Sequence, residues 1–110
     1  MYARFRGLQP WLQPYAQYLH DYAVSAGFRP AVTSVYRSNQ RQAVLYERYL
    51  RGLSDLPAAP PGKSKHNYGL AFDLVTQSGG YRGQQQAQLG AVWAAMGGRW
   101  FEGDPVHFEV

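Results

Sequence analysis

The sequence of 110 residues contains no cysteine. Disulfide bonds and thiolate metal sites are therefore excluded, and any metal site would have to use histidine and carboxylate ligands. No run approaches the 18 apolar residues that a membrane-spanning helix needs, so no membrane span is expected. The basic residues Arg4 and Arg6 are not followed by an apolar segment, and no signal peptide is predicted. We therefore expect either release by another route or a domain cut from a longer chain.

Charged residues are also few, at 16% of the chain against 45% hydrophobic residues, which is typical of a folded domain. The length allows one hydrophobic core and not two, so residues 1–110 are predicted to form a single domain, which we expect to be a monomer. The net charge is +4, but the eleven Lys and Arg residues are scattered without a dense basic run. Nucleic-acid binding is therefore not expected.

Hydrophobic periodicity predicts helices at residues 10–26, 38–51 and 84–96, and β-branched or alternating segments predict strands at 31–36, 70–75 and 106–110. In the second helix, Leu45, Tyr46, Tyr49 and Leu53 are expected to face inward. His20, which lies outside every motif, is expected to be solvated. This order of elements predicts an α+β fold in which about three helices pack on a small antiparallel sheet. The long proline-containing connection at residues 53–69 is typical of a functional loop.

Two of the three histidines lie near carboxylates at the predicted strands. His66 precedes the strand that carries Asp73, and His107 lies on the last strand, where side chains alternate between two faces. Two histidines and one carboxylate form an open zinc site that leaves one position for water. We therefore predict that His66, Asp73 and His107 bind Zn²⁺. Glu109 is a candidate for fixing the orientation of a ligating histidine.

Amide hydrolysis also needs a base for the attacking water and a donor for the oxyanion. Asp104, three residues before His107 and followed by a proline, is predicted to be the base, with Glu102 as its competitor. Arg37 is the predicted oxyanion or substrate contact. Two residues of the long loop, Ser64 and Tyr68, are predicted to form hydrogen bonds to the substrate.

Three stretches resemble the signature motifs of the VanY-type and M15 zinc peptidases. They are Ser34-Val-Tyr-Arg-Ser-Asn-Gln40, Ser64-Lys-His-Asn-Tyr-Gly-Leu-Ala-Phe-Asp73, and Gly97-Gly-Arg-Trp100 continuing to Asp104-Pro-Val-His-Phe-Glu109. That family includes D-alanyl-D-alanine carboxypeptidases and phage endolysins that cut between L-Ala and D-Glu. The resemblance implies a Hedgehog/DD-peptidase-like fold and a peptidoglycan stem peptide as the substrate, so action on the bacterial cell wall is expected.

The resemblance also implies roles for single residues: zinc ligation by His66, Asp73 and His107, general base for Asp104, and substrate or transition-state contacts for Arg37 and Ser64. The sequence of residues 66–71 is more similar to the L-Ala-D-Glu endopeptidase branch than to the carboxypeptidase branch, although the proline-rich segment before Ser64 differs from the sequence common in the endopeptidase branch. A D-alanyl-D-alanine carboxypeptidase is the alternative within the family. The alternative from another class is a non-catalytic, zinc-stabilised module that binds the cell wall.

Overall fold

The computed structural model describes residues 2–55 and 57–110. Its helices are α1 (Gln13–Ser25), α2 (Asn39–Leu50) and α3 (Gln84–Ala95), and its strands are β1 (Pro30–Ser34), β2 (Ala71–Thr76), β3 (Arg99–Trp100) and β4 (His107–Glu109). Two short 3-10 turns, η1 (Ala3–Phe5) and η2 (Lys65–Tyr68), complete the described elements. Among the described residues, no helix has the length and apolar character needed to cross a membrane.

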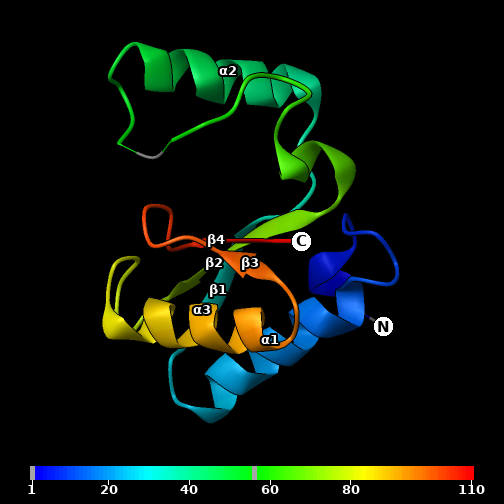
Figure 1. The fold of residues 1–110 in the computed structure, drawn as a ribbon, viewed down its shortest axis with the longest axis vertical. Helices are drawn as coiled ribbons and strands as arrows, with labels where there is room; N and C mark the ends of the chain where they lie inside the picture. Colours follow the sequence, from blue (N-terminus) through cyan, green and yellow to red (C-terminus); the bar gives the residue numbers. More distant parts are fainter. Residues whose placement is uncertain (1, 56) are drawn as a thin grey trace.

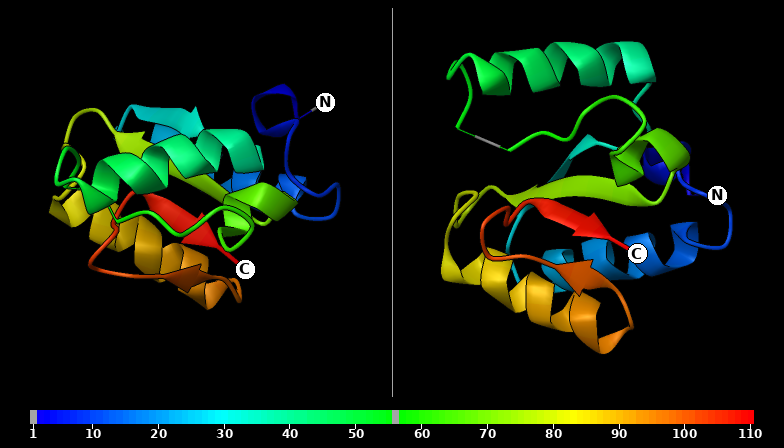
Figure 2. Two further views of the ribbon diagram at one scale, coloured as in Figure 1. Left: turned by 90° about the horizontal axis from the view of Figure 1, so that it is seen from above. Right: turned by 45° about the horizontal axis from the view of Figure 1, so that its top comes forward.

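The four strands form an antiparallel sheet in the order β1-β2-β4-β3 within the described part of the chain. Helices α1 and α3 lie together against one face of this sheet, and α2 lies beyond the opposite face together with the loop that follows it (Figures 1 and 2). The predicted α+β class, with three helices on a small antiparallel sheet, is therefore confirmed. The two-residue strand β3 and both 3-10 turns were not predicted, because such short segments carry no periodicity.

The hydrophobic core lies between the sheet and the α1/α3 layer. Phe72 of β2 is at its centre, with its ring 5.2 Å from the rings of Phe5 and Trp93 and 5.4 Å from that of Phe108. All four aromatic side chains are almost completely buried. Because side chains alternate along a strand, burying Phe72 and Phe108 on this face turns their neighbours toward α2. The opposite face of β2 and β4 is therefore free to carry polar residues.

Helix α2 begins where it was predicted, with the Ser38 hydroxyl accepting a hydrogen bond from the backbone N–H of Arg41. Its predicted inward face is only partly correct. Leu45 and Tyr46 are half-buried, but Tyr49 is 40% exposed and Leu53 is 63% exposed. The reasons are that α2 lies over the polar face of the sheet and is not packed into the core, and that the helix ends at Leu50, before Leu53.

The prediction for His20 was wrong. It belongs to the buried side of α1, where its side chain is 11% exposed and Nδ1 lies 3.4 Å from a carboxylate oxygen of Asp21. The imidazole thus extends the stripe of buried α1 residues that contains Ala16, Leu19 and Ala23.

Candidate metal centre and cleft

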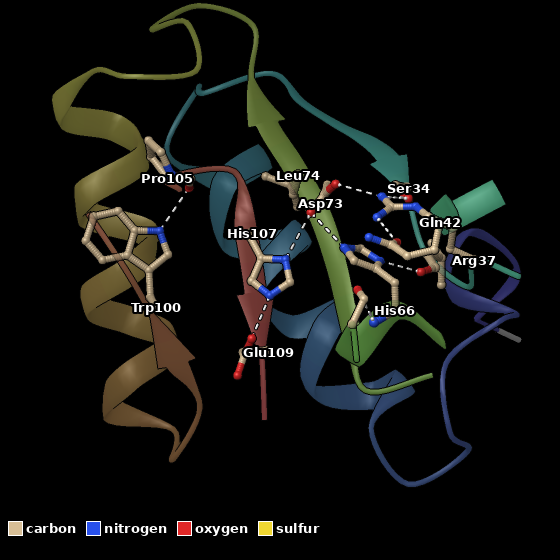
Figure 3. A network of polar contacts seen from close by, with 12 residues as sticks. Ser34, Arg37, Gln42, His66, Asp73, Leu74, Trp100, Pro105, His107 and Glu109 are labelled. Atoms are coloured by element: carbon tan, nitrogen blue, oxygen red, sulfur yellow. Dashed lines mark hydrogen bonds and ion pairs between the residues drawn. The ribbon is translucent and has the colours of Figure 1, made fainter. Parts of the chain in front are cut away.

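His66, Asp73 and His107 come together on the face of the sheet that is turned away from α1 and α3 (Figure 3). Asp73 of β2 is paired with His107 of β4 in the sheet, and His66 belongs to η2, just before β2. Oδ1 of Asp73 lies 3.1 Å from Nε2 of His66 and 3.5 Å from Nδ1 of His107. One ligand atom from each residue lies within 4.8 Å of the others, so the group could hold a metal ion.

The second ring nitrogen of each histidine is held by an acceptor. Nδ1 of His66 lies 2.6 Å from the carbonyl oxygen of Val35, and Nε2 of His107 lies 2.8 Å from Oε1 of Glu109. Each imidazole therefore keeps one nitrogen directed toward Asp73. Metal-ligating histidines are usually oriented by such outer acceptors, and two imidazoles with a carboxylate are a donor set that suits zinc. The residues present therefore fit a zinc ion.

Local hydrogen bonds fix the turn that carries His66. The Ser64 hydroxyl accepts from the His66 backbone N–H at 3.2 Å, and the Asn67 side-chain oxygen accepts from the backbone N–H of Ser64 and of Gly62. Gly69 ends the turn with a φ of +68°, a conformation that favours glycine. A β-carbon there would also lie 2.9 Å from the carbonyl oxygen of Gly7. This segment of the sequence is therefore suited to a tight turn that leads directly into β2.

Arg37 lies next to the carboxylate oxygen of Asp73 that the two histidines do not contact. The register of β1 against β2 shifts between Val32 and Ser34, so that β1 ends opposite Asp73 and not at Tyr36 as predicted. Nη2 of Arg37 lies 3.4 Å from Oδ2 of Asp73 and donates to the Ser34 hydroxyl at 2.7 Å. Just beyond the end of β1, the guanidinium thus contacts the carboxylate that is shared by the two histidines.

The charges of the group shift several pKa values. Burial alone would raise the pKa of Asp73, but the hydrogen bonds from His107 and His66 outweigh it and hold that pKa well below its usual range. Burial lowers the pKa of His107, whereas its hydrogen bonds to Asp73 and Glu109 raise it by more, so the pKa stands above its usual value. The carboxylate of Asp73 is therefore the anionic centre of the group, and nitrogens of Arg37, His66 and His107 surround it.

Asp104 lies in the turn before β4 and faces the same space. Burial raises the pKa of its carboxyl group, and Asp73 raises it further, against the opposing effect of His107. Its competitor for the role of base, Glu102, is exposed and does not line the cleft. Of the two carboxylates, Asp104 is the one that the fold places next to the metal group.

These residues form the floor of a cleft of about 620 Å³. Its walls come from α2 and from the proline-containing loop, including Leu45, Tyr49 and Pro57. The walls also carry three cationic side chains, Arg48, Lys63 and Lys65, none of which forms an ion pair within residues 2–55 and 57–110. The acidic residues of the cleft thus lie at the metal group and the free cations lie around it.

The two residues that were predicted to bind substrate from the loop differ in position. Ser64 is 8% exposed and lines the cleft beside His66. Tyr68 does not come together with the other predicted residues: its ring lines a separate surface depression with residues 7–10, and its hydroxyl donates to the carbonyl oxygen of Gly62 at 2.7 Å. Its contact with substrate stays a prediction.

Two glutamines contribute to the site and were missed. Gln42 of α2 is 1% exposed, accepts from Nη1 of Arg37 at 3.0 Å and donates to the carbonyl oxygen of Ala59 at 2.8 Å, which joins the arginine to the loop. Gln86 of α3 is equally buried and donates to the carbonyl oxygens of Leu74 and Pro105, the residues that follow Asp73 and Asp104. Both have a signal in the sequence, because each lies on the apolar stripe of its predicted helix, three residues before Leu45 and Leu89 respectively.

The family model VanY, described as D-alanyl-D-alanine carboxypeptidase, matches residues 6–98. YodJ, a curated protein of Bacillus subtilis (strain 168), is 34% identical over 67 residues. That match covers 57% of this chain but only 24% of YodJ.

Solved structures have the same fold. The LdcB LD-carboxypeptidase is 26% identical with a TM-score of 0.74, and the match covers 93% of this chain and 64% of that one. The L,D-carboxypeptidase DacB of Streptococcus pneumoniae is 24% identical with a TM-score of 0.72, over 93% and 65% of the two chains. The vancomycin resistance D,D-pentapeptidase VanY, solved in complex with Zn(II), is 23% identical with a TM-score of 0.71, over 93% and 71%.

Proposed function

This chain belongs to the VanY D-alanyl-D-alanine carboxypeptidase family, and on that premise we propose that it is a zinc-dependent peptidase that cuts the peptide part of peptidoglycan. The observation that carries the proposal is the group His66, Asp73 and His107, whose imidazoles are oriented from behind by Val35 and Glu109. A carboxyl group with a raised pKa and a guanidinium face the same group. This combination is typical of a hydrolytic site and not of a closed structural one.

Zinc held by the three ligands would supply a Lewis acid that polarises the scissile carbonyl and makes water more acidic. Asp104 accepts a proton from the attacking water and returns it to the leaving amine; its raised pKa brings it closer to the pH at which proton transfer is efficient. Arg37 donates hydrogen bonds to the oxyanion or to a substrate carboxylate, and its contacts with Ser34 and Gln42 hold the guanidinium in place.

The cationic side chains on the cleft walls are evidence that the substrate is acidic. Arg48, Lys63 and Lys65 have no acidic partner within the described residues, so they are available to the carboxylates of a stem peptide. Such charges act mainly on the rate of encounter and on the Michaelis constant, and their effect weakens with salt.

Two kinds of cleavage are candidates, removal of the terminal residue and cleavage within the stem. The description of the family and the names of the similar structures favour a carboxypeptidase that releases the terminal residue. The sequence of residues 66–71 favours the L-Ala-D-Glu endopeptidase activity that phage endolysins have. Mass spectrometry of muropeptides after digestion distinguishes them, since a carboxypeptidase shortens the stem by its last residue and the endopeptidase releases the stem beyond L-Ala.

The test of the proposal is digestion of purified peptidoglycan with the zinc-loaded protein, with and without a chelator. We expect release of peptide products that stops with chelator and returns when zinc is added. Asp104→Ala should keep zinc and lose hydrolysis, whereas the matched control Glu102→Ala should keep both. A zinc-stabilised module that only binds the wall predicts no products from any of the three proteins. Cleavage that resists the chelator would exclude the metal mechanism.

A further inference from the structure

The carbonyl oxygen of Pro105 accepts two hydrogen bonds from buried side chains. Nε2 of Gln86 donates to it at 2.7 Å and Nε1 of Trp100 donates to it at 2.9 Å, the latter visible in Figure 3. Pro105 itself is buried, and it lies between Asp104 and His107 in the sequence. Two donors from different elements, α3 and β3, thus meet on the carbonyl group of the residue that directly follows Asp104.

Both donors are themselves held firmly. Gln86 is 1% exposed and uses its whole amide: its oxygen accepts from the backbone N–H of Thr76 at 2.7 Å, and its nitrogen also donates to the carbonyl oxygen of Leu74 at 3.1 Å. The ring of Trp100 lies directly on Gly90 of α3, where a β-carbon would be 2.2 Å from the indole. A glycine on the buried side of α3 is therefore needed for the indole to reach Pro105.

The fold gives His107 and Asp104 different anchors. His107 belongs to β4 and is paired with Asp73 across the sheet, so its position is set by the strands. Asp104 lies outside the strands, in a turn in which its N–H donates to Phe101 and its carbonyl accepts from His107. Its carboxylate has no hydrogen bond or ion pair within the part of the chain that is described. The backbone of the turn therefore sets the place from which that carboxylate extends, without help from a side-chain hydrogen bond among the described residues.

We propose that Trp100 and Gln86 are positioning residues for catalysis, which hold Asp104 over the metal group through the carbonyl of Pro105. The inference depends on the proposed function, in which Asp104 is the base. The metal ligands have their own support in the β2–β4 pair, so the two hydrogen bonds to Pro105 act on the proton-transfer step and not on metal binding.

Trp100→Phe is the direct test, because it keeps an aromatic ring against Gly90 and removes the N–H. We expect kcat to fall roughly tenfold to a hundredfold, the range for a reacting group displaced by about 1 Å, with KM and zinc content unchanged. Gln86→Met keeps the length of the side chain but also removes the hydrogen bonds to Thr76 and Leu74 of β2, so it should lower both kcat and the free energy of unfolding. Leu89→Ala on the same helix is the matched control: it lowers the free energy of unfolding from a buried position, and it should leave kcat unchanged below the melting temperature.

A double-mutant cycle separates positioning from a general structural effect. If Trp100 acts through Asp104, then Trp100→Phe costs nothing further in an Asp104→Ala background. In the more active Asp104→Glu background, the two losses should combine to less than their product. The proposal is overturned if Trp100→Phe leaves kcat unchanged, if zinc is lost in parallel with kcat, or if the losses multiply. Full activity of Asp104→Ala would instead refute the role of Asp104 in the proposed function.

Discussion

Glu109 offers the sharpest test of the metal centre, because it touches a proposed ligand without being one. Its Oε1 lies 2.8 Å from Nε2 of His107, and both side chains are only 14% exposed. We therefore expect Glu109→Ala to leave the fold and the three ligands in place and to free the imidazole of His107 to rotate. The predicted effect is weaker zinc binding.

The size of the effect follows from the contact. Removing the outer partner of a ligating histidine typically lowers metal affinity tenfold to a hundredfold, or about 1.4–2.7 kcal/mol. The contact between Glu109 and His107 is short, involves a charged acceptor and is largely screened from water. The dissociation constant for zinc should therefore rise toward the upper end of that range, by roughly fifty- to a hundredfold.

The effect should also depend on pH. Burial lowers the pKa of His107, but its hydrogen bonds to Asp73 and Glu109 raise it above the usual value. Zinc requires the neutral imidazole, so this raised pKa lets protons compete with the metal in acid. Glu109→Ala lowers the pKa of His107 and relieves that competition. The loss of affinity should thus be complete at about pH 8, above the usual histidine pKa, and smaller near about pH 6.

The assay is a zinc titration against a chromophoric chelator at both pH values, with Glu102→Ala as the control. Glu102 is an exposed carboxylate of the same segment and lies outside the cleft, so its removal should not change zinc affinity. An unchanged dissociation constant for Glu109→Ala at the higher pH would refute the reasoning. Equal losses in both variants would attribute the effect to net charge and would refute it as well.

Three further changes test other parts of the molecule. Arg37→Lys should lower kcat roughly a hundredfold with zinc retained, since a lysine cannot reproduce the fork of donors; steady-state kinetics and metal analysis check this. Phe72→Ala should cost about 3–5 kcal/mol in the free energy of unfolding by opening a cavity at the centre of the core, measured by denaturant titration of the zinc-loaded protein. In the metal-free protein, the pKa of Asp73 is lower in the folded state than in the unfolded state, so its ionised form stabilises the fold. This contribution is complete above the unfolded-state pKa of about 4 and is lost as the pH falls toward the lower folded-state pKa. The difference in unfolding free energy between wild type and Asp73→Asn should therefore shrink on acidification, and a constant difference would contradict this sign.

Much of the fold was predictable because its signals are local. The three helices have apolar stripes or a capping residue, and the two central strands alternate around Phe72 and Phe108. The errors occurred where tertiary packing decides burial. Leu53 continues the helical periodicity and was expected in the core, yet α2 ends at Leu50 and Leu53 is exposed in the loop that follows. His20 looks like a surface residue by type, yet it lies on the buried side of α1.

The sequence by itself determined which chemical groups are available: the chain has no cysteine, and two of its three histidines lie near carboxylates at or just before predicted strands. Strand alternation then requires Asp73 and His107 to face away from the core, as the buried Phe72 and Phe108 face into it. The tertiary structure decided the rest, because those contacts join segments far apart in the chain. The register of β2 against β4 sets Asp73 opposite His107, and β1 ends opposite Asp73, three residues before Arg37. The two donors on Pro105 come from α3 and β3, and no local pattern in the sequence specifies that they meet there.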